Sequence, residues 1–101
     1  MGTVIPFEDP SDYARIHRRI KRLWDEGSFT FPDVHVEQRM KKREMDVLDI
    51  QHIVRYGSII SHDRRGAQWR YRIQGSRVDG KTASCVVAVE GGVLIISVLD
   101  Y

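Results

Sequence analysis

The sequence predicts an α+β domain in which N-terminal helices pack on a four-stranded antiparallel sheet. Three observations favour this fold class. Apolar residues recur at helical spacing between residues 9 and 57, the period changes to two after Gly57, and short turns separate the later apolar runs. A chain of 101 residues suffices for one domain. We therefore expect a single domain over residues 1–101, with a tail or edge strand (1–8), a mainly helical part (9–57) and a sheet (58–101).

The first predicted helix begins after residues 9–12, where cap residues and a proline suit a first turn, and it ends at Gly27. Its apolar stripe consists of Tyr13, Ile16, Ile20, Leu23 and Trp24. Five cations occupy the opposite face, namely Arg15, Arg18, Arg19, Lys21 and Arg22. They either contact nucleic acid or form a solvated face beside Asp25 and Glu26.

Two shorter helices follow a linker at 28–32 that carries two phenylalanines. Asp33 can cap a helix from Val34 to about Arg43. Asp46 can cap the next one, with Asp49 three residues later as an approximate capping box, and Gly57 ends it. The two helices form a hairpin.

The sheet is predicted from four apolar or alternating segments at 58–61, 68–74, 83–89 and 93–99, with turns at 63–66, 79–80 and 90–92. Short connections favour an antiparallel meander. In the second segment Trp69, Tyr71 and Ile73 alternate with polar residues that include Arg70 and Arg72. Period-two alternation therefore places one face of this strand in the core and two guanidinium groups on the other.

Composition narrows the functional classes only slightly. The net charge is +2 and the pI is about 8.9, so a nucleic-acid role depends on local clustering of cations. The lone Cys85 lies in an apolar run and is expected to be buried and inert. The absence of a disulfide framework, a signal segment and a spanning stretch predicts a cytoplasmic protein without membrane contact. No zinc-ligand spacing occurs, and no metal or cofactor is expected.

A histidine and two arginines share one face of the second helix, because His35, Arg39 and Arg43 are spaced four residues apart. A histidine one turn before an arginine can shuttle a proton beside a phosphate clamp. The alternative is structural, with His35 bonded near the helix start and Arg39 paired with a carboxylate.

The sheet half carries a second set of cations. It comprises Arg70, Arg72 and Lys81, with His62, Arg64, Arg65 and Arg77 as further candidates. Cleavage of RNA without a metal needs a base for the 2′-hydroxyl, cations for the phosphate, and an acid for the leaving oxygen. Tyr101 can stack a base or transfer a proton. The alternative is a solvent-facing polar surface.

Several of these segments resemble a bacterial family of domains of unknown function, of the DUF4258 type, related to the RelE/ParE and MqsR-type toxins of toxin–antitoxin modules. The resemblance covers Val34 to Tyr101. It is carried by residues 35–40 with Arg43, by 45–50 with Val54 and 57–60, by 71–75 with 79–81, and by 95–98. It implies a RelE-like fold and a ribosome-dependent or free mRNA endonuclease that a cognate antitoxin neutralises. Basic sheet residues and a residue near the C-terminus serve catalysis in such toxins, and Arg70, Arg72, Lys81 and Tyr101 match these by position.

The resulting hypothesis is a toxin-like mRNA endonuclease that needs no metal. The expected catalytic residues are His35, Lys81 and Tyr101, and the expected RNA-binding residues are Arg39, Arg64, Arg70 and Arg72. His35 or Tyr101 would transfer protons, and Lys81 would stabilise developing charge. The expected partners are a cognate antitoxin and mRNA. The alternative function is a non-catalytic protein- or nucleic-acid-binding module of the same fold.

Overall fold

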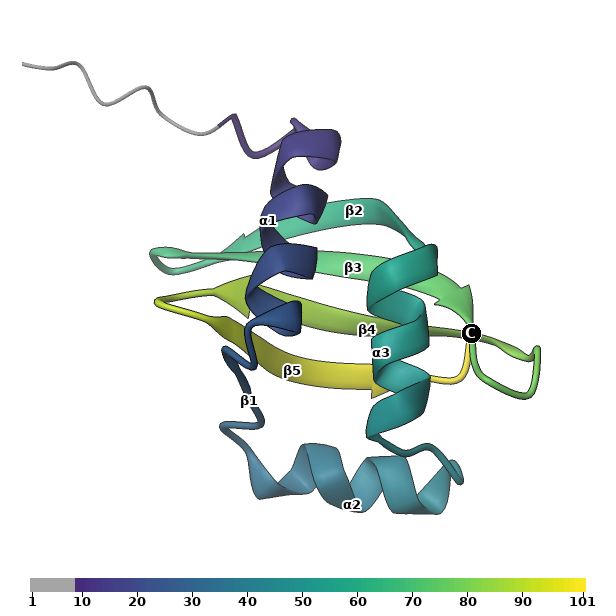
Figure 1. Cartoon of the computed structure of the whole chain (residues 1–101). Helices are drawn as coiled ribbons and strands as arrows, with labels where there is room; N and C mark the ends of the chain where they lie inside the picture. Colours follow the sequence, from purple (N-terminus) through teal and green to yellow (C-terminus); the bar gives the residue numbers. More distant parts are fainter. Residues whose placement is uncertain (1–8) are drawn as a thin grey trace, which may run out of the picture.

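A computed structural model describes residues 9–101, so the tail or edge strand expected at 1–8 lies outside the described residues. The fold is α+β, as predicted, with three helices and a five-stranded sheet in this range (Figure 1). The elements are α1 (Tyr13–Asp25), β1 (Phe29–Thr30), α2 (Val34–Lys42), α3 (Val47–Tyr56), β2 (Ser58–Arg65), β3 (Gln68–Ser76), β4 (Thr82–Val89) and β5 (Val93–Leu99).

All three helices begin at the aspartates that the sequence indicates. The side chain of Asp12 accepts a hydrogen bond from the Arg15 N–H, and Asp33 caps α2 in the same way. At α3 both halves of the capping box form, because Asp46 and Asp49 each accept from the other's backbone N–H. These side chains satisfy donors that a helix start otherwise leaves unpaired.

The sheet is mixed, with the strand order β1-β5-β4-β3-β2, and this corrects the prediction of four antiparallel strands. The strands β2 to β5 do form an antiparallel meander. The fifth strand is β1, which pairs in parallel with β5 through Phe29 opposite Val93 and Thr30 opposite Leu94. A strand of two residues has no detectable period, and so the segment reads as a packed linker in the sequence.

The hairpin between β2 and β3 is also longer than predicted. We expected a turn at 63–66, but β2 continues to Arg65 and pairs with β3 through Arg65 opposite Gln68. Only Gly66 and Ala67 connect the two strands, and Gly66 has a φ of +60°. A two-residue hairpin loop needs positive φ, which glycine adopts without strain.

The helices α1 and α3 lie across one face of the sheet, while α2 packs beside β1 and β5 at the edge (Figure 1). The core between them contains Ile20, Ile50, Ile53, Ile73, Val87 and Ile95, each fully buried. None of the described helices covers the opposite face, which we call the open face of the sheet. The predicted packing of the N-terminal helices on the sheet is therefore confirmed.

Candidate nucleic-acid interface

The pleat of β3 distributes its side chains between the two faces as predicted. Tyr71 and Ile73 are buried under the helices, whereas Arg70 and Arg72 are half-buried and belong to the open face. Trp69 shares the helical side with Tyr71, but 37% of its surface remains exposed at the end of the sheet. The open face thus presents two guanidinium groups from one rigid strand.

Arg72 is held in a cluster with Ser84 and Tyr101. Its Nε donates to the Ser84 hydroxyl at 3.0 Å, and its Nη2 donates to the Tyr101 backbone oxygen at 2.9 Å. The Ser84 hydroxyl donates to the same oxygen at 2.7 Å. The guanidinium carbon lies 4.7 Å from the centre of the Tyr101 ring, and Tyr101 is 61% exposed. Since arginine has five N–H donors, the donors outside these two bonds can face a ligand.

Arg70 is oriented by a shorter polar chain. Its Nε donates to the Gln68 side-chain oxygen at 2.7 Å, and the Gln68 amide donates to Glu90 at 3.0 Å. Arg70 and Arg72 are two residues apart on one strand, so their Cα atoms lie roughly 6.5 Å apart. The two guanidinium groups can therefore engage one extended anionic chain.

Arg64, expected to bind RNA with this set, lies on the helical side of the sheet. It pairs across the strands with Trp69, and its guanidinium carbon lies 5.6 Å from the centre of the Trp69 ring. Its Nε donates to the backbone oxygen of Gly66 at 2.9 Å. Arg64 therefore belongs to the edge near α1 rather than to the open face.

His35 and Arg39 lie on the exposed side of α2, the helix that packs beside β5. The His35 Nδ1 lies 3.2 Å from the Gln38 side-chain oxygen, and the His35 backbone N–H donates to Asp33. Within residues 9–101, no hydrogen bond or ion pair joins either side chain to Arg72.

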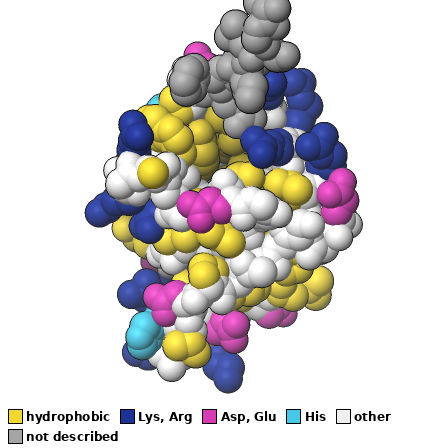
Figure 2. Space-filling model, turned by 90° about the vertical axis from the view of Figure 1, so that its left-hand side faces the viewer, with side chains coloured by type: hydrophobic (Ala, Val, Ile, Leu, Met, Phe, Trp, Pro, Cys, Tyr) yellow, Lys and Arg dark blue, Asp and Glu magenta, His cyan; other side chains and the backbone are white. Residues whose placement is uncertain are grey.

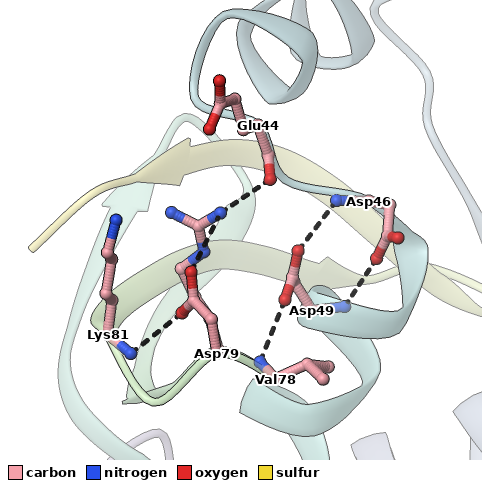
Figure 3. A network of polar contacts seen from close by, with 7 residues as sticks. Glu44, Asp46, Asp49, Val78, Asp79 and Lys81 are labelled. Carbon is pink, nitrogen blue, oxygen red and sulfur yellow. Dashed lines mark hydrogen bonds and ion pairs between the residues drawn. The ribbon is translucent and has the colours of Figure 1, made fainter.

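Lys81 lies in the loop between β3 and β4, which packs toward the helices (Figure 3). Its backbone N–H donates to Asp79 at 3.0 Å. Asp49 anchors the loop by accepting from the Val78 N–H at 3.0 Å, and Arg77 donates to a backbone oxygen of the α2–α3 connection at 2.6 Å. The Lys81 ammonium group makes no contact in the network of Figure 3, and among residues 9–101 no hydrogen bond or ion pair joins it to Arg72, Ser84 or Tyr101.

The structure thus brings Arg72 and Tyr101 into contact, with Arg70 two residues away on the same strand. Among residues 9–101, no hydrogen bond or ion pair joins His35, Arg39, Arg64 or Lys81 to these residues. Ser84, which orients Arg72, was not predicted as a site residue. Its available signal was a lone hydroxyl within the apolar run 83–89. His62 and Tyr13 were also not predicted as a pair, although the Tyr13 hydroxyl lies 2.7 Å from the His62 Nδ1.

The lone cysteine is buried, as predicted. Cys85 lies in the core, and burial raises the pKa of its thiol to about 12. A thiol in this environment stays protonated near neutral pH and is a poor nucleophile. Residues 9–101 contain no group of three histidine, cysteine or acidic side chains placed to hold a metal ion.

Residues 34–100 match the family described as Domain of unknown function (DUF4258), and the chain belongs to this family. The match begins at α2 and extends just beyond β5, leaving α1 and β1 outside it. No curated protein and no solved structure matches the chain. Within residues 9–101, each helix is too short or too polar to cross a membrane.

Proposed function

We propose that this chain binds single-stranded RNA on the open face of the sheet. The observation that supports this function best is the Arg72–Ser84–Tyr101 cluster, in which a fixed guanidinium group lies beside an exposed aromatic ring. Arginine holds phosphate oxygens through charge-assisted hydrogen bonds, and an aromatic ring stacks on a base. Arg70 supplies the second phosphate contact along the same strand.

A second candidate function is cleavage of the bound RNA, as in a RelE-like toxin that an antitoxin neutralises. It is favoured by the position of the Tyr101 ring over Arg72, because a phenol can transfer a proton beside the cation that holds the phosphate. In this reaction the ribose 2′-hydroxyl gives its proton to water as its oxygen bonds to phosphorus, and the bond from phosphorus to the 5′-oxygen breaks. The leaving 5′-oxygen takes a proton from the Tyr101 phenol, which water then reprotonates. Arg72 stabilises the charge on the phosphate.

Binding is tested by fluorescence anisotropy with a labelled single-stranded RNA. The substitutions Arg70→Gln and Arg72→Gln should each weaken affinity at least tenfold, since a charge-assisted bond contributes about 1.5–3 kcal/mol. Each should also reduce the slope of log affinity against log salt by about 0.7. Lys42→Gln, an exposed cation on α2, is the matched control and should leave both quantities unchanged. Wild-type affinity in both arginine variants would reject the proposal.

Cleavage is tested separately by incubating the protein with RNA and mapping the new 5′ ends. We expect Tyr101→Phe to abolish cleavage while anisotropy still reports binding, because the ring and its stacking remain. Replacing the attacking 2′-hydroxyl with hydrogen should protect the corresponding bond. If wild-type protein binds the RNA and leaves it intact, the cleavage function is rejected and the binding function stands.

A further inference from the structure

A second candidate site lies on the helical side of the sheet, where the first turns of α1 meet the ends of β3 and β4. A cavity of about 150 Å³ is lined there by Ile16, Arg19, Trp69, Tyr71 and Glu90, among others. Figure 2 shows this side of the molecule, with a hollow of hydrophobic side chains between groups of Lys and Arg side chains. The cavity is separate from the Arg72 cluster, because Tyr71 and Trp69 project from the other face of β3.

A cationic groove adjoins this cavity along α1. Its lining consists of Arg15, Arg18, Arg19 and Arg22, and its volume is about 560 Å³. Arg19 lines both hollows, so the groove and the cavity adjoin at this side chain. The four residues follow the spacing of one helix face, where like charges three or four residues apart repel. The first turn of α1 holds no acidic residue to offset them.

Three of the four guanidinium groups in this groove have no partner within residues 9–101. Among the described residues, the side chains of Arg15, Arg18 and Arg22 make no hydrogen bond and no ion pair. An anion in the groove would satisfy these donors and relieve the repulsion between the guanidinium groups. The groove therefore favours a phosphate-bearing ligand over an apolar peptide.

The cavity supplies an aromatic wall in a fixed orientation. The Trp69 ring centre lies 5.5 Å from that of His62, and His62 is in turn held by the Tyr13 hydroxyl at 2.7 Å. Gln68 and Glu90 also line the cavity, and the Gln68 amide donates to the Glu90 carboxylate. Glu90 repels a phosphate there and can accept a hydrogen bond from the amino group of a base. The cavity lining thus contains both a cation, Arg19, and an anion, Glu90.

We infer that this combined hollow binds one nucleotide of a single-stranded nucleic acid, with the base against Trp69 and the phosphate among the α1 arginines. The same chemistry recurs in single-strand binders, in which aromatic rings stack the bases and a positive groove follows the backbone. The inference concerns a different face from the proposed RNA site and does not depend on it.

Tryptophan fluorescence provides the test, because the chain has two tryptophans in different environments. Trp24 is 4% exposed and stacks on Phe29 with ring centres 3.9 Å apart, so it is inaccessible to a base. Titration with an unlabelled oligouridylate should quench the Trp69 emission to saturation. Trp69→Phe should abolish the quenching and leave the Trp24 emission constant. The double variant Arg18→Gln/Arg22→Gln should raise the apparent Kd at least tenfold, roughly the size of one or two phosphate contacts.

Two control variants distinguish this site from general attraction to surface cations and from binding on the open face. Lys41→Gln/Lys42→Gln removes two exposed cations from α2 and should leave the quenching curve unchanged. Arg72→Gln disables the open face and should also leave Trp69 quenching unchanged. Quenching that survives in Arg18→Gln/Arg22→Gln, or that is lost in Arg72→Gln, would overturn the inference. Equal quenching by heparin, a polyanion without bases, would overturn it as well.

Discussion

At the scale of single residues, Arg72 illustrates what a strand pattern predicts and what it omits. Alternation with Tyr71 and Ile73 is sufficient to assign Arg72 to the solvent side of β3. The bonds to Ser84 and Tyr101 depend on strand register and on the path of the chain after β5. A local sequence pattern contains neither, so the orientation of the guanidinium group emerges only from the fold.

Cys85 gives a prediction at the same scale. Its folded pKa of about 12 lies above the reference value of 9.0 because burial disfavours the thiolate. Below pH 9 the Cys85 thiol is protonated in both the folded and the unfolded protein, so it does not change the free energy of unfolding. As the pH rises from 9 toward 12, only the unfolded thiol ionises, and the free energy of unfolding falls. At pH 10.5 the resulting loss in the free energy of unfolding is about 2 kcal/mol.

Urea unfolding at pH 8 and pH 10.5 measures this loss, with Cys85→Ala as the reference that lacks the thiol. Wild-type protein should lose about 2 kcal/mol more than Cys85→Ala over this interval. A thiol reagent at pH 8 should label wild-type protein only at the rate at which it unfolds. Rapid labelling of folded protein would show that Cys85 is accessible, contrary to the structure.

At the scale of elements, the sequence predicts best where capping residues and periodicity coincide. The aspartates at 12, 33 and 46 locate all three helix starts, and Gly57 marks the end of α3. The prediction is wrong for β1, because its two residues are stabilised by pairing with β5 rather than by local propensity. The candidate site was likewise predicted only in part. The alternation of a strand is a local pattern that the sequence shows, whereas the position of α2 relative to the sheet depends on contacts between distant segments.

The crossing of α3 over β3 yields the next prediction. A Cβ added to Gly75 would lie 2.9 Å from the Gly57 Cα, where the helix ends. The opposing atom is backbone and cannot rotate away. Gly75→Ala should therefore lower the free energy of unfolding by about 1–3 kcal/mol, the usual effect of overpacking.

Urea unfolding of this variant beside Ser76→Ala tests the close approach. Ser76 is the next residue along the strand and is exposed, so its truncation should change stability by less than about 0.5 kcal/mol. Equal stability of Gly75→Ala and Ser76→Ala would mean that the helix end and the strand are farther apart than the 2.9 Å contact requires.

At the scale of the whole molecule, α1 and β1 lie outside the family match and yet complete the fold. The match covers residues 34–100, whereas Ile16, Ile20 and Trp24 of α1 belong to the same buried core as α3 and the sheet. The strand β1 also pairs with β5 on the side opposite β4. The matched segment alone would therefore expose an apolar sheet face and an unpaired strand edge.

A fragment of residues 34–101 should consequently fail to unfold cooperatively. Burying each large apolar side chain contributes about 1.5–3 kcal/mol, so losing three removes about 5–9 kcal/mol from a typical total of about 5–15 kcal/mol. Circular dichroism during urea titration should show a sigmoidal transition for the full chain and a gradual change for the fragment. Ile20→Ala in the full chain should lose about 2–5 kcal/mol, because it leaves a cavity under the helix. Arg18→Ala, on the exposed face of the same helix, should stay within about 0.5 kcal/mol of wild type. A cooperative fragment as stable as the full chain would show that the core beneath α1 contributes nothing to folding.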